Sequence, residues 1–411
     1  MRILYLHPNA WTGEYPILRE LIRQGHEVCV LEECRELNGA RSLSRYFREP
    51  GDGIATLWYD PHRGWEKIFT WPVDRIFKRD FEGRNLLHRI WVIREAVHQF
   101  DPDAIISSEG FGYGIPASFL KRLGGLQTPL LTSYIGGDIL DCPEARVGKR
   151  RKGWTGWLIR KGVENPELLR PVSPLVGEAL LAEGADPGKI HVVPSHLVME
   201  SRKLEEFREI RSLVRRQFHE SHSIPPTAPL LITLGGNQKG KGLQNLLEAW
   251  PAILAVIPEA RWILCGPRDP WFVKEVEPGL KKFAESIVCT GTLSGVAVFE
   301  HLAAADLHIN PSLCESLNMV TVEAASVGTP TICSDRAGIC HWIRQYDAGT
   351  VFESKNIQAL TDAIIQAIYS PEMRTRWSIS CRELAKEFSV ERVAAMLVDC
   401  FVTLPNLRSR F

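Results

Sequence analysis

The sequence predicts a two-domain α/β protein, in which each domain is built around a parallel β-sheet. The chain has 411 residues, a length typical of two domains. Short apolar runs alternate with helical segments along most of it, and this alternation starts twice, at Arg2 and again at Leu230. Such a β-α-β rhythm favours parallel strands joined by right-handed crossovers. We expect two Rossmann-like domains that face each other across a cleft.

The first half carries the less regular version of this pattern. Its strands are predicted at residues 2–6, 27–31, 103–107, 129–134 and 169–172, and its helices at residues 15–24, 86–99 and 174–183. The loop at residues 7–13 follows the first strand, at the sheet edge where open α/β folds bind ligands, so Gly13 is a candidate ligand contact. The loop lacks G-x-G-x-x-G, and a dinucleotide fingerprint is therefore not assigned.

The second half repeats the pattern more cleanly. Strands are predicted at residues 230–234, 261–265, 287–290, 307–310 and 331–334, with helices at residues 243–256, 271–286, 296–304 and 320–327. A charged, proline-containing stretch at residues 195–229 precedes the first of these strands and marks the domain boundary. We assign residues 1–195 to the first domain, 196–388 to the second, and 389–411 to a C-terminal helix that packs back on the first domain.

The composition excludes several classes of protein. Apolar residues make up 45% of the chain and charged residues 24%, as in ordinary globular proteins. The 49 basic and 49 acidic residues balance, so no overall field favours nucleic acid. No apolar run is long enough to predict a transmembrane helix. The ten cysteines form no C-x-x-C pair, which favours reduced thiols in a cytoplasm. Since no cluster has metal-ligand spacing, we expect no bound metal.

A loop rich in glycine and lysine joins the strand at residues 230–234 to the following helix. Gly235 and Gly236 allow backbone amides to approach an anion, and the helix N-terminus favours phosphate. Lys239 and Lys241 add positive charge at the same place. The loop is thus a candidate phosphate-binding element.

Three interpretations of this loop remain open. Gly235, Gly240 and Lys241 fit the Walker A pattern G-x-x-x-x-G-K, which would indicate a P-loop nucleotide hydrolase. The next residue, however, is Gly242 instead of the Ser or Thr that holds Mg²⁺. A different phosphate loop and a plain glycine turn are the alternatives.

The segment at residues 306–335 has the pattern strand, loop, helix, turn and strand. Glu315 lies in the loop and Glu323 lies one turn into the helix, with seven residues between them. Helical side chains lean toward the helix N-terminus, so Glu323 is expected to reach back toward the loop. Cys314 has no adjacent base and is interpreted as a packing residue. We expect the two carboxylates to form the floor of a ligand site.

The order of these motifs resembles family 4 of the retaining glycosyltransferases, which have the two-domain GT-B fold. The resemblance covers most of the chain and is most specific between Leu230 and Gly338, where it includes the E-x₇-E pattern at Glu315 and Glu323. It implies transfer of a sugar from a nucleotide-diphosphate sugar to an acceptor hydroxyl with retention of configuration and without a cofactor. The acceptor would be a glycan, a lipid-linked molecule or a small molecule.

The resemblance also implies a role for each matching residue. Glu323 would bind the ribose hydroxyls of the donor, and Glu315 would orient the donor sugar at its reacting face. Lys241, together with Lys239, would neutralise charge on the departing diphosphate. Backbone amides at the start of the helix would bind the diphosphate. The residues that carry these amides are Ser316, Leu317, Asn318, Met319 and Val320.

The chain departs from the family pattern at three places. Gly236 stands where the family usually has an Arg, and Ser316-Leu317-Asn318 replaces the commoner Gly-Phe-Gly. A His-Gly-x-Asp-like turn keeps only its Gly and Asp, and Asp138 either positions the sugar or acceptor or caps the turn. These departures keep open a protein that binds a nucleotide sugar without transferring it.

A basic and aromatic stretch at residues 146–161 suggests a membrane surface as a partner. It carries seven basic side chains and no acidic one, with Trp154 and Trp157 among them. Trp combined with Lys and Arg is typical of segments that lie on an anionic leaflet. The hypothesis is a lipid-linked or membrane-adjacent acceptor and a peripheral location at the inner face of the membrane. The alternative is a solvated loop whose Trp side chains are anchored in the core.

Overall fold

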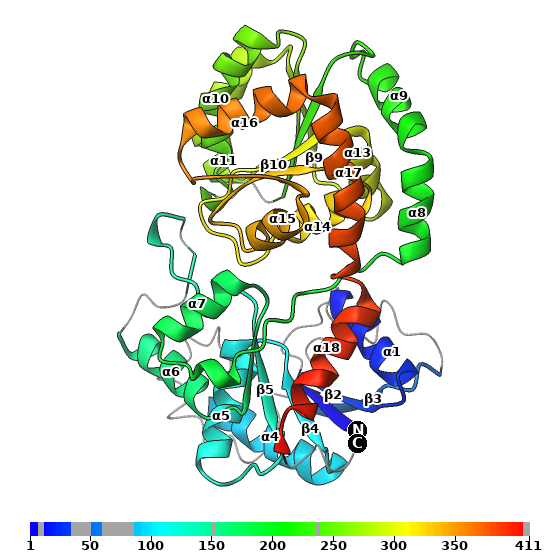
Figure 1. Cartoon of the computed structure of the whole chain (residues 1–411). Helices are drawn as coiled ribbons and strands as arrows, with labels where there is room; N and C mark the ends of the chain where they lie inside the picture. The colour runs from blue at the N-terminus through cyan, green and yellow to red at the C-terminus, as the bar shows by residue number, and fades with distance from the viewer. Residues whose placement is uncertain are drawn as a thin grey trace. The chain divides into compact units, whose positions relative to one another are not determined.

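The chain divides into two compact units, each with its own sheet. In the computed structural model of Figure 1, residues 1–6, 12–33, 51–59, 86–145, 147–148, 153–235 and 239–405 are described. Unit 1 contains Met1–Asp141, Gly148–Val198 and Val390–Phe411, and unit 2 contains Cys142–Val147 and Met199–Ser389. Each unit has a six-stranded sheet in which every pair of neighbouring strands is parallel. The predicted α/β fold class is therefore confirmed.

The sheet of unit 1 has the Rossmann strand order β3-β2-β1-β4-β5-β6. Its strands are β1 (Arg2–Leu6), β2 (Glu27–Glu33), β3 (Ala55–Tyr59), β4 (Ala104–Ser107), β5 (Leu130–Tyr134) and β6 (Leu168–Pro171). Its helices are α1 (Tyr15–Arg23), α4 (Leu86–Phe100), α5 (Ile115–Arg122), α6 (Gly153–Glu164), α7 (Pro174–Ala182) and α18 (Val390–Val402). A π-helical turn at Gly110–Gly114 joins β4 to α5.

Alternation along β1 explains how helices cover both faces of this sheet. Ile3 and Tyr5 pack in one apolar cluster with α1 and α18, whereas Leu4 and Leu6 pack in another with α4 and α5. Side chains of a strand point to opposite faces in turn, and a parallel sheet buried on both faces is apolar at every position. The last helix, α18, thus packs in the core of unit 1 beside α1.

The sheet of unit 2 repeats the same topology in the order β12-β11-β10-β7-β8-β9. Its strands are β7 (Leu230–Leu234), β8 (Arg261–Cys265), β9 (Ile287–Gly291), β10 (Leu307–Asn310), β11 (Thr331–Ser334) and β12 (Gly349–Phe352). Its longer helices are α8 (Ser201–Glu209), α9 (Arg211–Ser221), α10 (Leu243–Val256), α13 (Val296–Ala304), α14 (Met319–Ser326), α16 (Ile357–Tyr369) and α17 (Pro371–Lys386). Shorter helices are α11 (Pro270–Glu275), α12 (Glu277–Leu280) and α15 (Cys340–Tyr346).

The core of unit 2 contains two buried Trp side chains whose polar atoms are satisfied. The indole N–H of Trp250 donates to Ser286 at 3.0 Å, and that of Trp262 donates to Thr233 at 2.8 Å. Because buried polar groups are costly without a partner, these bonds hold the core in one arrangement. The order of the sheet reverses between β7 and β10, and ligands of open α/β sheets bind at such a switch point.

Several elements differ from the sequence prediction. The predicted helix at residues 271–286 is broken into α11, α12 and a 3₁₀ turn, since Pro278 lies inside it and lacks a backbone N–H. Residues 153–161 of the basic stretch lie in helix α6, which was not predicted because Gly162 lies near its end. A Cβ there would lie 2.9 Å from Ile115, so the glycine permits close packing on α5. The edge strands β3 and β12 were not predicted.

Candidate functional site

The loop after β7 approaches the loop after β10 through backbone contacts. Gly235 has φ +139° and donates its N–H to the carbonyl of Cys265 at 3.1 Å. Further along, Leu313 donates its N–H to the carbonyl of Gly240 at 2.8 Å. Glycine adopts such a conformation without strain. The two loops are thus held together at the carboxyl ends of neighbouring strands; Gly236 lies outside the described residues.

Gly242, the residue that departs from the Walker A pattern, has a structural reason to be glycine. Its φ is +64°, and a Cβ at this position would lie 1.9 Å from the carbonyl oxygen of Pro311. A Ser or Thr therefore does not fit here without moving the loop after β10. This packing argues against a P-loop, because the side chain that would hold Mg²⁺ has no room.

An ion pair joins the two loops at the site. The Nζ of Lys241 contacts Oε2 of Glu315, and their side chains are 26% and 18% exposed. The backbone of Glu315 is fixed on both sides, since its N–H donates to Arg336 at 3.0 Å and its carbonyl accepts from Gly338 at 3.0 Å. The structure thus brings together two residues that the sequence singled out in separate motifs.

Asn318 gives the loop after β10 the turn that glycine supplies in the family pattern. Its φ of +79° is left-handed, a conformation that Asn tolerates better than most residues. As the N-cap of α14, its Oδ1 accepts from the N–H of Thr321 at 2.9 Å and from the Thr321 hydroxyl at 3.0 Å. The start of α14 is thereby well defined, with Leu317 buried before it and Met319 and Val320 in its first turn.

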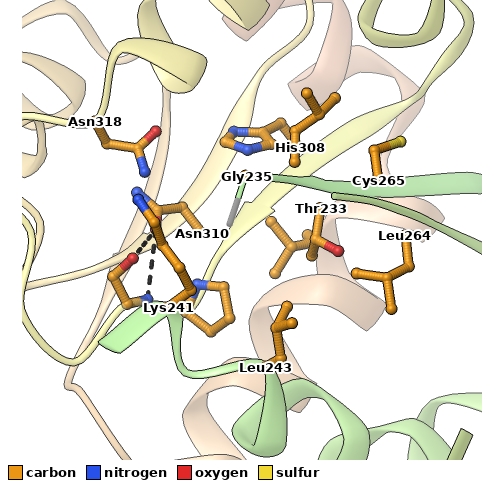
Figure 2. A pocket seen from close by; sticks show the side chains of 13 residues that line it. Thr233, Gly235, Lys241, Leu243, Leu264, Cys265, His308, Asn310 and Asn318 are labelled. Carbon is orange, nitrogen blue, oxygen red and sulfur yellow. Dashed lines mark hydrogen bonds between the residues drawn. The ribbon is translucent and has the colours of Figure 1, made fainter. Parts of the chain in front are cut away.

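A pocket at the switch point collects several of these residues. Figure 2 shows Lys241, Asn310 and Asn318 at one end of it, with His308 and Cys265 nearby. The pocket is lined by residues from β7, β8 and β10, from the loops after β7 and β10, and from the start of α10. These residues are Thr233, Leu234, Gly235, Lys241, Leu243, Leu264, Cys265, His308, Ile309, Asn310, Pro311, Ser312 and Asn318.

His308 lines the pocket but is held neutral. It is 1% exposed, and burial together with the charge of Lys241 lowers its pKa to about 3. Its Nδ1 lies 3.2 Å from the hydroxyl of Thr331. An imidazole with this pKa carries no positive charge at neutral pH, so His308 shapes the pocket and does not add a cation.

Glu323 lies on α14 and is partly buried. Burial alone raises the pKa of its carboxyl to about 7. No hydrogen bond or ion pair joins this carboxyl to the residues that the structure describes. A buried carboxyl with a perturbed pKa and no partner is a candidate functional group. It does not line the pocket of Figure 2, and Lys239 is exposed and does not line it either.

Asp138 and Gly13, the two candidates from the first half, lie in unit 1. The Asp138 carboxylate is 5% exposed and accepts from the N–H groups of Gly110, Ile135 and Gly136 at 2.9, 3.3 and 2.8 Å. Burial raises its pKa, and these amides oppose that effect. This geometry is that of a residue capping its own turn, the second of the two roles the sequence allows. Gly13 lies in a 3₁₀ turn after β1.

Other expectations from the sequence bear on chemistry at the site. Burial, followed by the neighbouring Cys142, raises the pKa of Cys314 to about 12, so its thiol is a poor nucleophile. Among the described residues, no three His, Cys, Asp or Glu side chains gather as metal ligands would. Within the same ranges, no helix is both long and apolar enough to cross a bilayer. Asn310 also lines the pocket at the end of β10, although no sequence motif singled it out.

Two family models match this chain, one in each half. The model described as "Glycosyl transferases group 1" matches residues 214–383, and the "Glycosyl transferase 4-like domain" matches residues 15–196. A phosphatidyl-myo-inositol mannosyltransferase of Mycobacterium leprae is 23% identical over 171 residues, which are 41% of this chain and 45% of that protein. The lipopolysaccharide glucosyltransferase WaaG of Escherichia coli is 25% identical over 208 residues, 49% of this chain and 52% of that protein. The chain spans about half the length of the curated relatives it matches.

Solved structures show the same fold over nearly the whole chain. Anabaena Alr3699/HepE in complex with UDP has a TM-score of 0.73 at 14% identity, over 98% of this chain and 100% of that one. The structure of WaaG, a glycosyltransferase involved in lipopolysaccharide biosynthesis, has a TM-score of 0.63 at 16% identity, over 97% and 98% of the two chains. The chain belongs to family 4 of the glycosyltransferases, with the GT-B fold.

Proposed function

We propose that the chain is a retaining glycosyltransferase that takes a sugar from a nucleotide-diphosphate sugar and transfers it to an acceptor hydroxyl. The observation that carries this proposal is the pairing of Lys241 with Glu315 at a pocket formed by the carboxyl ends of β7, β8 and β10. A cation, a glycine loop and a helix N-terminus meet there, and together they suit a phosphate ester. The UDP complex of HepE, a protein of the same fold, supports a nucleotide as the ligand.

Charge on the leaving diphosphate is the main demand of such a transfer. Lys241 would offset it, because its ammonium group already lies at the pocket, and the N–H groups at the start of α14 would donate to the phosphoryl oxygens. Without donor, Lys241 is neutralised by Glu315. A diphosphate carries more negative charge than a single carboxylate, so it would compete for this ammonium group and leave Glu315 available to the sugar.

Glu323 is the proposed contact to the ribose. Its carboxyl has no partner among the described residues, and its raised pKa means that burial disfavours the charged form. Two ribose hydroxyls would donate to the carboxylate and relieve this cost. Donor binding would thus favour loss of the Glu323 proton, and affinity is expected to increase as the pH rises toward about 7.

Retention requires the acceptor hydroxyl to attack from the face that the diphosphate leaves. Glu315 orients the sugar in this proposal and forms no covalent intermediate, and neither a metal nor another cofactor takes part. Addition of EDTA is therefore expected to leave turnover unchanged. Loss of activity that Mg²⁺ or Mn²⁺ restores would refute the metal-independent mechanism.

A lipid-linked or membrane-adjacent acceptor is proposed from the surface of unit 1. Trp157 on α6 is 46% exposed, and its ring centre lies 6.0 Å from that of Phe119 on α5. Leu123, at the end of α5, is 75% exposed, and Arg122 and Arg160 are exposed on the same two packed helices. Aromatic, aliphatic and basic side chains on one helix pair suit an anionic membrane surface. Two relatives are named for a phosphatidyl-inositol and a lipopolysaccharide.

The proposal is tested with the full chain and a panel of nucleotide sugars. A bound donor raises the melting temperature, since it binds the folded state only. The donor found in this way is then incubated with candidate acceptors, and NMR of the product gives the anomeric configuration. Inversion at the anomeric carbon would contradict the retaining mechanism. Donor binding without slow donor hydrolysis or transfer would instead favour a non-catalytic nucleotide-sugar-binding protein.

A further inference from the structure

Asn310 ends β10 with a buried amide that is only half satisfied. The residue is 3% exposed and lines the pocket. Its Oδ1 accepts from the hydroxyl of Ser312 at 2.6 Å and from the Ser312 N–H at 3.4 Å. Its Nδ2 is buried and has no hydrogen-bond partner among the residues that the structure describes. Buried donors in folded proteins are almost always paired, so an unpaired one at a pocket points to a ligand.

Asn318 presents a second amide to the same pocket. Its Oδ1 is engaged by Thr321, which fixes the orientation of the side chain. With the oxygen directed at the helix, Nδ2 is the end that remains for a ligand. Figure 2 shows the Asn318 amide directed toward Lys241 and Asn310. Glycine, which the family pattern places here, would supply the same left-handed turn but no side-chain donor.

Lys241, Asn310 and Asn318 each present a hydrogen-bond donor to this end of the pocket. Lys241 is a cation, and each amide offers N–H groups once its oxygen is occupied. His308 is neutral, because its pKa is lowered to about 3 by burial and by Lys241. A cation together with N–H donors from two amides favours an anion over a sugar hydroxyl or a cation.

We propose that the side-chain amides of Asn310 and Asn318 are phosphate-binding groups that act with Lys241 on the diphosphate of the donor. This inference rests on the proposed function, because it assigns residues to the same pocket. It differs from the backbone contacts expected at residues 316–320, since it depends on two side chains. Specificity for the diphosphate would then come from hydrogen bonds that two neutral amides donate and from the positive charge of one Lys.

The test uses Asn310→Asp and Asn318→Asp in the full chain. Aspartate keeps the oxygen that accepts from Ser312 or Thr321, and it suits an N-cap with a left-handed φ as asparagine does. The substitution replaces the donor nitrogen by an acceptor oxygen and adds a negative charge, which the matched control adds as well. The matched control is Asn356→Asp, at the N-cap of α16: its Oδ1 accepts from the N–H of Ala359 at 2.9 Å, and the residue does not line the pocket.

Binding is measured by calorimetry with UDP, GDP and ADP, each against its own nucleoside, and with inorganic pyrophosphate. Both pocket variants are expected to lose at least about tenfold in affinity for the diphosphate that binds, from the lost hydrogen bond to a charged group, with no change for the nucleoside. The control should bind as the unmodified chain does. Equal diphosphate affinity in all four proteins would overturn the inference.

The same experiment separates the inference from the proposed function. If the unmodified chain binds pyrophosphate but no nucleotide, and the two variants lose it, the amide site stands and the nucleotide-sugar function fails. If a nucleoside diphosphate binds and the variants do not weaken it, the function stands and the amide site fails. If the unmodified chain binds neither nucleotide nor pyrophosphate, both are wrong.

Discussion

Replacement of Glu323 by Gln should stabilise unit 2 in a pH-dependent way. The carboxyl has an ordinary pKa of 4.5, which burial raises to about 7. Between these values the folded chain holds a proton that the unfolded chain has lost, so stability falls as the pH rises through this window. Gln has the same shape and never ionises. The variant should therefore equal the unmodified chain below pH 4.5 and exceed it above pH 7.

The size of the effect follows from the two pKa values. Each tenfold change in proton affinity corresponds to about 1.4 kcal/mol, so the difference between 4.5 and about 7 amounts to roughly 3 kcal/mol as an upper bound. At pH 5 the same linkage leaves less than about 1 kcal/mol. For a unit of this size, about 3 kcal/mol shifts the melting temperature by roughly 6–12 °C.

Calorimetric melting at pH 5, 6, 7 and 8.5 measures this difference directly. Glu248→Gln is the matched control, because Glu248 is an exposed residue on α10 of the same unit. The control should show no pH-dependent gain. If Glu323→Gln and the unmodified chain melt at the same temperature at every pH, burial does not raise the pKa of this carboxyl. The reason for expecting a ribose contact there is then lost as well.

Three further predictions concern the pocket and the surface. Gly242→Ser should lower stability by about 1–3 kcal/mol and abolish nucleotide binding, because its Cβ would lie 1.9 Å from Pro311 O; tight Mg-ATP binding by this variant would revive the P-loop interpretation. Glu315→Gln should lower kcat without weakening donor binding, as stopped-flow and calorimetry together would reveal; a loss confined to affinity would reverse the assignment. Trp157→Ala should weaken sedimentation with anionic vesicles and leave neutral vesicles unaffected; no binding by the unmodified chain would end the membrane hypothesis.

The alternation of short apolar runs with helical segments predicted most of the strands and helices. The five strands predicted in the second half correspond to β7–β11, because buried parallel strands are short continuous apolar runs. The edge strand β12 lacks this signal: it begins at Gly349, whose φ of +153° lets its backbone lie against Thr331, and only three residues of higher β propensity follow. The grouping of residues 142–147 with unit 2 could not be predicted from the sequence either. It depends on contacts between residues far apart in the chain, such as that of Glu144 with Lys355 at 2.7 Å.

The parts of the site whose backbone is fixed by a motif were predictable from the sequence. The contacts between its side chains were less predictable. Glycines and lysines of the loop after β7 marked a phosphate element, and spacing singled out Glu315 and Glu323. The contact between Lys241 and Glu315 could not be predicted from the sequence, because it joins residues of two different loops. Asn310 has no distinctive spacing in the sequence. That its Nδ2 lacks a partner among the described residues is visible only in the tertiary structure. The membrane hypothesis depends in part on residues 149–152, which lie outside the described residues.

Nucleotide-sugar binding by the unmodified chain and by Lys241→Ala is the most direct test of the account. Calorimetric titration of both proteins with the same panel of nucleotide sugars measures it, since the ammonium group of Lys241 lies at the pocket and is proposed to offset the diphosphate. We predict that the unmodified chain binds one of these donors and that the variant loses at least about tenfold in affinity. Equal affinities, or no binding of any nucleotide sugar by the unmodified chain, would contradict the proposed function.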